Sequence, residues 1–308
     1  MVELDSHTYQ RKHKIVNYFQ NRAQEILHEA TQKYGEEQYK KVARYLNKGI
    51  QKARDSITST IEKKSRKQNW DGEILLKNVL AIDYSCDVVM LDYRNQVWPY
   101  STISFARRIG ERWEDFVKLC FEYSLKELEF FVPPVFADVK SRLEEEIYEY
   151  IEQLNIPRKK KEQLKKYYTK VWRLVDSGAV KLELDLHFEQ GGRKYNVDFK
   201  SGFGSNEKGN VNRLLLVATT YDIIEQEDYE CLLLVRAPED ENNNYFQTLK
   251  NSGIWDAYTG RETYDEVQKY TGFDLRGWVE EYIEWEEDFS PSTYSYLNEE
   301  DLTKYLRW

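Results

Sequence analysis

The chain has 308 residues, of which 41% are hydrophobic, so it is long enough for one large domain or for a core with an appended domain. Its 45 Lys and Arg face 54 Asp and Glu, which gives a net charge of −9. The three cysteines are widely spaced and no Cys/His cluster occurs, which argues against a zinc site and a disulfide framework. The first thirty residues contain no signal-like run and no stretch approaches transmembrane length, so we expect a soluble, cytoplasmic protein without membrane contacts.

The charge is distributed unevenly along the chain. Residues 1–70 carry 15 Lys and Arg against 8 Asp and Glu, whereas residues 221–308 carry 7 against 22. Such asymmetry is typical of a protein whose basic end binds a polyanion and whose acidic end faces solvent. The negative net charge of the whole chain is therefore compatible with a nucleic-acid partner. Basic clusters occur at Arg11-Lys12, Lys63-Lys64-Ser65-Arg66-Lys67, Arg107-Arg108 and Arg158-Lys159-Lys160-Lys161. Each cluster by itself is more typical of a solvated face than of a phosphate site.

The N-terminal third of the chain is predicted to be mainly helical. Residues 6–67 lack Pro and repeat apolar side chains at helical spacing, with a break at Gly35. The pattern continues over residues 74–81, but the short apolar run 86–91 predicts a strand. A further helix is expected from Gly110, and Pro133-Pro134 would end it.

The segment 104–117 predicts a loop that enters this helix. Trp113, Phe116 and Val117 fall at helical spacing and form a buried stripe. Glu114 shares a face with Val117, so it is drawn towards the interior, where a carboxylate is costly unless it is paired with a charge or a metal. The alternative is a surface Glu favoured by the helix dipole, an explanation that fits Glu111 better.

A charged hairpin is predicted after a helical region over 137–177 that is interrupted at Pro157. Apolar residues alternate with polar ones along 180–188 and, after Gly191-Gly192, along 195–199, which predicts two half-buried strands. Their pairing places Asp185, Asp198 and Lys200 on one side, opposite the apolar side chains. Two carboxylates and an ammonium on neighbouring strands can hold a divalent cation and polarise a water beside a phosphate. The alternative is an ordinary amphipathic hairpin whose outer face is charged.

Helices and strands are predicted to alternate after the hairpin. We expect a glycine-containing loop over 202–209, a helix capped by Asn210, a strand buried on both faces at 231–235, a helix over 243–251, a strand at 254–258, helical structure over 263–287 and an irregular tail from Ser290 to Asp301. This order predicts an α/β fold with a mixed central β-sheet flanked by helices, preceded by a helical N-terminal region.

Three other sequence features are weak indicators of a binding or catalytic site. Gly204 and Gly209 have the spacing of a phosphate-binding loop, but Asn210 replaces the required Lys, so no nucleotide cofactor is expected. Gly202 and Gly204 lack the third glycine of a dinucleotide fingerprint. His187 could act as a base near Asp185, but a solvated strand histidine is the more common situation.

The hairpin resembles the PD-(D/E)-x-K nuclease superfamily, and within it the type II restriction endonucleases. Asp185 matches the first acid of that family, and Asp198-Phe199-Lys200 matches the second half of the motif. Leu184 stands where the family often has Pro. The run from Gly110 to Glu114 is similar to the Gly-x-x-aromatic-Glu helix that often precedes the catalytic strands in these nucleases.

The resemblance implies a magnesium-dependent endodeoxyribonuclease that cuts double-stranded DNA at a specific sequence, usually as a homodimer. By that resemblance Asp185, Asp198 and the carbonyl of Phe199 would hold Mg²⁺, for which Mn²⁺ could substitute. Lys200 would lie near the attacking water, and Glu114 would support the metal or its water.

DNA contacts are expected outside the metal site as well. Candidate contact residues are Asn206, Lys208, Asn210, Lys63, Lys64, Arg66, Lys67, Arg107 and Arg108. The implied division is a helical region 1–70 that contacts DNA or a partner subunit, and a nuclease domain 71–308 whose restriction-endonuclease-like core covers about 105–285. The alternatives are a structure-specific or repair nuclease of the same fold and a non-catalytic DNA-binding protein.

Overall fold

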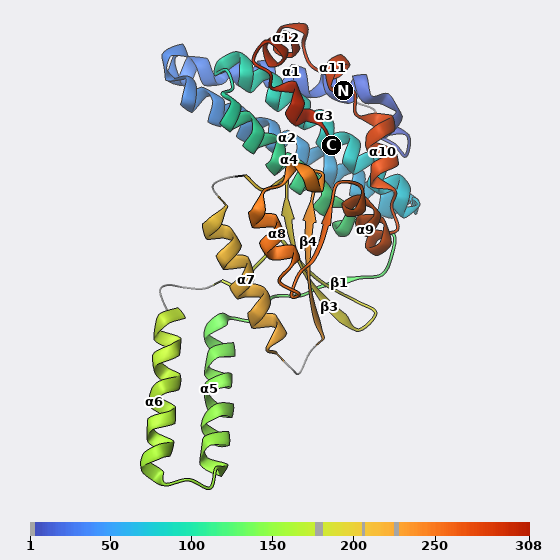
Figure 1. The fold of residues 1–308 in the computed structure, drawn as a ribbon. Helices are drawn as coiled ribbons and strands as arrows, with labels where there is room; N and C mark the ends of the chain where they lie inside the picture. The colour runs from blue at the N-terminus through green and yellow to red at the C-terminus, as the bar shows by residue number, and fades with distance from the viewer. Residues whose placement is uncertain (1–3, 176–180, 205–206, 225–227) are drawn as a thin grey trace.

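The computed structural model describes residues 4–175, 181–204, 207–224 and 228–308 (Figure 1). Its strands are β1 (Glu129–Phe130), β2 (Leu186–Gln190), β3 (Arg193–Lys200), β4 (Tyr229–Val235) and β5 (Asp256–Thr259). Its helices are α1 (Lys12–Tyr34), α2 (Tyr39–Gln68), α3 (Gly72–Val97), α4 (Thr102–Glu122), α5 (Phe136–Gln153), α6 (Arg158–Val175), α7 (Lys208–Asp222), α8 (Asn244–Lys250), α9 (Arg261–Thr271), α10 (Leu275–Tyr282), α11 (Trp285–Asp288) and α12 (Pro291–Glu299). Short 3-10 turns span Thr8–Arg11, Glu36–Gln38, Glu239–Glu241 and Thr303–Leu306.

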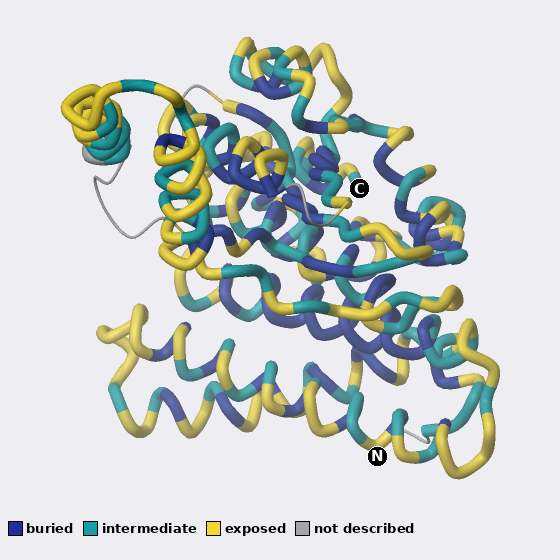
Figure 2. Tube along the Cα trace, turned by 90° about the horizontal axis from the view of Figure 1, so that it is seen from below, coloured by how far each residue is buried: buried dark blue, intermediate teal, exposed yellow. Residues whose placement is uncertain are grey.

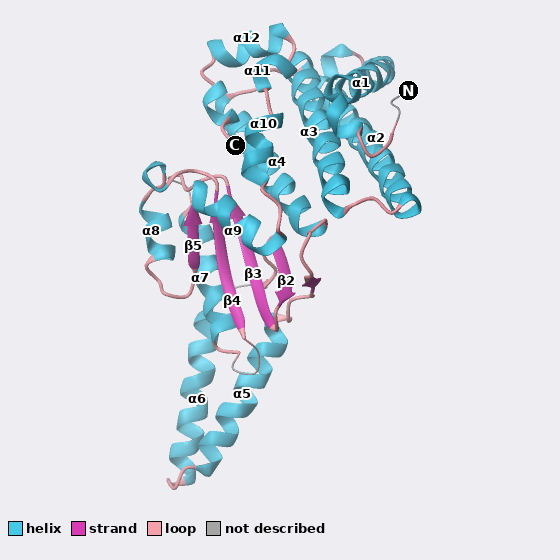
Figure 3. Ribbon diagram, turned by 90° about the vertical axis from the view of Figure 1, so that its right-hand side faces the viewer, coloured by secondary structure: helices cyan, strands magenta, loops and turns pink. Residues whose placement is uncertain are grey.

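The five strands form one mixed sheet in the order β1-β2-β3-β4-β5. The β1–β2 and β2–β3 pairs are antiparallel, and the β3–β4 and β4–β5 pairs are parallel. Val197 in the middle of β3 is opposite Leu186 of β2 and Leu232 of β4. The parallel pairs need crossover connections, which α7 and α8 supply. The expected α/β fold with a mixed sheet flanked by helices is therefore confirmed (Figure 3).

A separate apolar core covers each face of the sheet. On one face Phe188, Val197 and Phe199 pack in a cluster that extends through α4 and α9 to the N-terminal helices. On the other face Leu233 and Val235 pack against apolar side chains of α7 and α8. The strand β3 is buried on both faces, since Asn196 is 0% and Asp198 1% exposed. The prediction that this strand is only half buried was wrong, because α7 covers the side that its polar residues occupy.

The N-terminal helices α1, α2 and α3 pack against one another, and α12 packs on α3. Gly35 adopts a positive φ of 75° between α1 and α2, as expected for a helix break. The predicted strand at 86–91 was wrong, because this run lies in the middle of α3. Every residue from Asn78 to Asp92 of α3 is buried, and a helix buried on all sides shows no amphipathic period. Figure 2 shows the alternation of buried and exposed residues along the helices near the N-terminus.

Several helix boundaries differ from the expected ones. The helix predicted from Gly110 begins at Thr102, where Ser101 and Ser104 form a capping box, and it ends at Glu122, well before Pro133. The region 263–287 divides into α9, α10 and α11. The tail from Ser290 is not irregular, because Ser290 caps α12 and Pro291 occupies its first turn. The interruption of the 137–177 region at Pro157 is confirmed by α5 and α6.

The helices α5 and α6 form an antiparallel hairpin that projects away from the sheet, on the side opposite to the N-terminal helices (Figures 1 and 3). Its side chains are largely exposed, and Tyr150, Tyr167 and Val171 are each more than half accessible. Across the described ranges, no helix combines the length and the apolar character that crossing a membrane requires.

Candidate active site

Asp185, Asp198 and Lys200, here called the acid–lysine cluster, lie together where β2 begins and β3 ends. Asp185 precedes β2 by one residue, and its Oδ2 accepts a hydrogen bond of 2.9 Å from the backbone N–H of Phe199. This bond fastens the carboxylate to the neighbouring strand, so its position is set by the sheet. The predicted placement of the three side chains on one side of the hairpin agrees with these contacts.

Asp198 is the buried member of the acid–lysine cluster. Its Oδ1 lies 3.3 Å from Nη2 of Arg213 on α7, and its Oδ2 contacts the ammonium of Lys200. Among the described residues, Oδ2 accepts no well-directed hydrogen bond, so its contact with Lys200 is an ion pair. Burial raises the pKa of the Asp198 carboxyl; the Lys200 ammonium opposes this shift and the Asp185 carboxylate adds to it.

Lys200 connects the two carboxylates. Its Nζ donates a hydrogen bond of 2.9 Å to the carbonyl of Phe199 and lies 3.9 Å from Oδ2 of Asp185. Burial alone would lower the pKa of this ammonium, but the attraction of Asp198 and Asp185 outweighs it and raises the pKa. Lys200 is therefore a cation at neutral pH.

The Lys200 ammonium contacts the same three oxygen-bearing groups that the family resemblance assigns to a metal, namely Asp185, Asp198 and the carbonyl of Phe199. Oxygen donors around a point charge are the ligand set that Mg²⁺ and Mn²⁺ prefer. Within the described part of the chain, no group of three or more His, Cys, Asp or Glu is placed to hold a metal. The protein would thus supply two carboxylates and one carbonyl, and water and phosphate oxygens would complete the shell. The residues fit such an ion.

Glu114 on α4 belongs to the same electrostatic environment. Burial raises its pKa to about 7, while Lys200 and Lys118 lower the pKa and Asp185 and Asp198 raise it further. The helix reaches this position because Gly110 lets it cross closely over the end of β3: a Cβ at Gly110 would lie 2.8 Å from Oγ of Ser201. The inward placement expected for Glu114 agrees with this environment.

Two basic residues of the site were not predicted. Lys118 lies one turn after Glu114, and its Nζ is 3.6 Å from Oδ1 of Asp185. The i, i+4 spacing from Glu114 was a signal for it. Arg213 reaches Asp198 from α7, and its Nη1 lies 3.5 Å from the carbonyl of Glu183. No local pattern marks Arg213, because its role depends on how α7 packs on the sheet.

His187 is a buried structural residue rather than a solvated strand histidine. It is 7% exposed, its Nε2 accepts a hydrogen bond of 2.9 Å from the N–H of Leu184, and its Nδ1 lies 2.8 Å from Oδ1 of Asn196. An acceptor at Nε2 assigns the proton to Nδ1, and burial lowers the pKa of the ring. The neutral imidazole therefore fixes the chain just before Asp185.

Some of the residues predicted to contact DNA form contacts within the protein, and others are exposed. Arg107 and Arg108 both form ion pairs with Glu111. Asn210 donates to Glu207 and lies inside α7, so it is not the helix cap; Glu207 occupies that position. Lys208 is exposed at the start of α7, and Asn206 lies outside the described residues.

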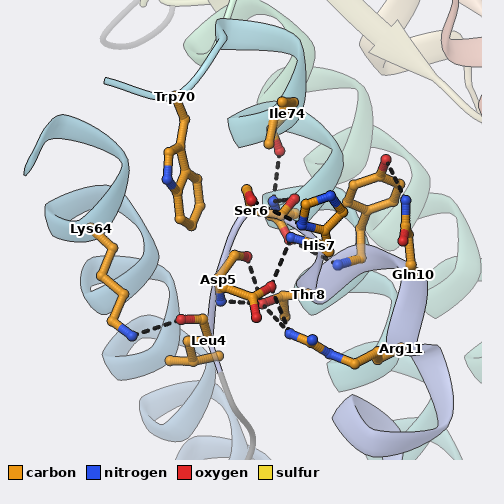
Figure 4. A network of polar contacts seen from close by, with 12 residues as sticks. Leu4, Asp5, Ser6, His7, Thr8, Gln10, Arg11, Lys64, Trp70 and Ile74 are labelled. Atoms are coloured by element: carbon orange, nitrogen blue, oxygen red, sulfur yellow. Dashed lines mark hydrogen bonds and ion pairs between the residues drawn. The ribbon is translucent and has the colours of Figure 1, made fainter. Parts of the chain in front are cut away.

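The basic run at the end of α2 is partly used for internal contacts. The Lys64 ammonium donates a hydrogen bond of 2.6 Å to the carbonyl of Leu4 and so ties the N-terminal segment to α2 (Figure 4). Lys63, Arg66 and Lys67 lie on the same last turns of α2. No contact among the described residues joins this run to the acid–lysine cluster, so its expected role in DNA binding stays a prediction.

A pocket of about 800 Å³ opens beside the acid–lysine cluster, at the carboxyl ends of β3, β4 and β5. Ser201, Arg236 and Arg261 are among its lining residues. Arg236 donates a hydrogen bond of 3.1 Å to the carbonyl of Tyr305 and forms no ion pair with a carboxylate in the described part of the chain. An arginine of this kind beside a carboxylate site favours an anionic group as a ligand.

No family model, curated protein or solved structure matches this chain. Two carboxylates, a carbonyl and a lysine converge at the ends of adjacent strands. Beside them burial raises the pKa of Glu114 to about 7, and a pocket lined by several arginines adjoins them.

Proposed function

We propose that the protein is a metal-dependent endodeoxyribonuclease that acts on double-stranded DNA, and specifically a type II restriction endonuclease. The observation that carries the proposal is the contact of the Lys200 ammonium with both the Asp198 carboxylate and the Phe199 carbonyl, next to Asp185. An ordinary charged sheet edge would expose these groups to water. Here Asp198 is buried beside a second carboxylate, an arrangement that is costly unless positive charge compensates it, and Lys200 and Arg213 supply that charge in the absence of a metal.

Each residue of the site has a role in phosphodiester hydrolysis. Asp185, Asp198 and the Phe199 carbonyl would hold Mg²⁺ or Mn²⁺, which supplies Lewis-acid polarisation of a phosphate oxygen and a more acidic water. Lys200 would then turn from the carboxylates towards the phosphate and stabilise the charge that develops as the water oxygen bonds to phosphorus and the P–O bond breaks. Glu114 would accept a proton of the attacking water when it is ionised.

The adjoining pocket gives the DNA backbone a place to lie. Arg236 and Arg261 line it next to Ser201, which directly follows Lys200. Phosphate contacts from arginine position a duplex without reading its sequence, so this pocket supports DNA as the substrate rather than a particular base sequence. Sequence-specific cutting of both strands would require two symmetric sites, and we propose a homodimer for that reason.

Digestion of a supercoiled plasmid tests the proposal. We expect cleavage with Mg²⁺ or Mn²⁺, none in excess EDTA, and none by Asp198→Asn, while Lys166→Ala on the exposed side of α6 serves as the matched surface control. Discrete fragments would support a restriction endonuclease, and smearing or cleavage only at junctions would support a structure-specific or repair nuclease instead. DNA binding without cleavage under any metal condition would leave a non-catalytic DNA-binding protein and refute the proposed chemistry.

A further inference from the structure

A groove of about 1150 Å³ runs between α1 and α2, apart from the acid–lysine cluster. Its rim on the α2 side is formed by Lys41, Arg44, Lys48 and Lys52. Among the described residues that line it, Glu29 on α1 is the one acidic side chain. Tyr18 and Tyr34 also line the groove and add phenolic hydroxyls that can donate hydrogen bonds, while the hydroxyl of Tyr45 donates to Glu29 at 3.4 Å.

The four cations on α2 are exposed, and no carboxylate of the described residues forms an ion pair with them. They follow one another at intervals of three or four residues, so they form a single row along the helix. No ion pair among the described residues involves any of the four, whereas Arg22 across the groove pairs with Glu25. Like charges at this spacing repel one another and destabilise a helix. A polyanion bound in the groove would remove that repulsion.

The floor of the groove depends on a close approach of the two helices. A Cβ at Gly49 would lie 2.8 Å from Cδ1 of Ile26, so a larger residue would displace the Ile26 side chain or the two helices. Ile26 and Ala53 form a buried floor beneath the charged rim. The row of cations therefore lies on a closely packed helix pair and not on a loop.

The charge of α2 contrasts with that of the whole chain. This helix contains ten Lys and Arg and two Asp and Glu, although the complete chain is acidic with a net charge of −9. The row from Lys41 to Lys52 spans about 16 Å at the rise of an α-helix. That length faces about five successive phosphates of one strand of duplex DNA. A straight row of this kind fits a rigid polyanion.

An anionic membrane surface is the less suitable partner for this row. Peripheral membrane helices insert exposed apolar side chains beside their cations. Among the exposed large hydrophobic residues of the described structure, only Tyr39 belongs to α1 or α2.

We propose that the α1–α2 groove is a second DNA-binding surface, which holds the phosphate backbone of a duplex through Lys41, Arg44, Lys48 and Lys52. This proposal rests on the proposed function only in taking duplex DNA as the ligand. The surface contributes sequence-independent affinity for DNA, whether or not the acid–lysine cluster cleaves it.

Fluorescence anisotropy with a labelled 30-base-pair duplex in EDTA tests the groove without cleavage. The variant Lys41→Gln/Arg44→Gln/Lys48→Gln/Lys52→Gln should bind at least tenfold more weakly at low salt. The slope of log K against log salt should fall in magnitude by about 3 to 4, close to 0.9 for each lost phosphate contact. The control is Lys159→Gln/Lys160→Gln/Lys166→Gln/Lys170→Gln on α6, which removes the same charge from exposed positions elsewhere. Circular dichroism should show equal folding of both variants.

The possible outcomes test the groove proposal independently of the proposed nuclease activity. An unchanged salt slope in the α2 variant would overturn the groove proposal, and so would an equal loss in the α6 control, which would mean that net charge alone decides binding. Binding by the wild type to phosphatidylserine vesicles but not to the duplex would assign the groove to a membrane and also overturn it. If the α2 variant loses DNA affinity while the wild type never cleaves with Mg²⁺, the groove stands and the nuclease assignment fails.

Discussion

The Lys200→Ala variant should lose stability as well as activity, and the stability lost should be recovered by a divalent cation. Asp198 is 1% exposed and lies beside Asp185, so Lys200 is its main counter-charge. Removing one partner of a buried ion pair typically costs about 3–5 kcal/mol. Arg213 remains 3.3 Å from Asp198 but its side chain is 42% exposed, so we expect a loss of about 3 kcal/mol in the free energy of unfolding.

Urea unfolding followed by tryptophan fluorescence measures this loss at pH 8, in EDTA and in excess MgCl₂. In the variant, Mg²⁺ can occupy the space between the oxygens without displacing an ammonium, so it should stabilise the variant more than the wild type. An ion present at 100 times its dissociation constant contributes about 2.7 kcal/mol. The loss in EDTA should shrink towards pH 4, because the Asp198 pKa is raised and protonation removes the uncompensated charge.

Two variants control this measurement. Lys166→Ala, at an exposed site on α6, should change stability by less than about 0.5 kcal/mol. Asp198→Asn removes the buried carboxylate and should abolish the stabilisation by Mg²⁺. If Lys200→Ala is as stable as the wild type in EDTA, or if Asp198→Asn responds to Mg²⁺ like the wild type, the cation-centred interpretation of the cluster is refuted. Cleavage by Lys200→Ala should in any case slow by roughly 10²-fold or more.

Further variants test the surroundings of the cluster. Because the pKa of Glu114 is raised from 4.5 to about 7, metal-free wild type should lose stability as pH rises through that window, and Glu114→Gln should remove about 1–3 kcal/mol of this dependence in urea titrations at pH 5 and 8. Gly110→Ala should slow cleavage by displacing α4, and adding Ser201→Gly should restore part of the rate; no rescue would mean that this contact is irrelevant. In thermal denaturation, Lys64→Met should lower the free energy of unfolding by about 1 kcal/mol, because its hydrogen bond to the Leu4 carbonyl is lost, whereas Lys63→Met should leave it unchanged.

The hairpin and the convergence of its charged residues were predictable, because a period of two fixes which side chains share a side. Asp185, Asp198 and Lys200 accordingly meet. The burial of Asp198 was not predictable: polar residues at alternate positions indicate a solvated face, and only the packing of α7 on that face contradicts this. On a solvated face Asp198→Ala and Lys200→Ala would leave folding nearly intact, whereas the loss of one partner of a buried ion pair destabilises the fold.

Predictions from local sequence were also wrong where tertiary packing buries every side of an element, because the hydrophobic period that marks a helix is then absent. The run 86–91 has the composition of a strand, yet it belongs to a helix enclosed on every side. His187 resembled a solvated residue because its two partners, the N–H of Leu184 and the side chain of Asn196, become neighbours only after the strands pair. By contrast, the Ser290-Pro291 start of α12 was a local signal that the sequence contained.

The helix α4 links the N-terminal helices to the chemistry of the site. It packs on α3 at one side and on the sheet at the other, and it carries both Glu114 and Lys118. Gly110 sets its separation from Ser201, which follows Lys200 directly, so a shift of α4 would change the surroundings of all three carboxylates. The raised pKa of Glu114 depends on the same placement, because the burial that causes it comes from the packing of α4 over the end of β3. The position of α4, and with it the helices that hold α4, therefore helps to set the geometry of the proposed active site and is not only a support for the fold.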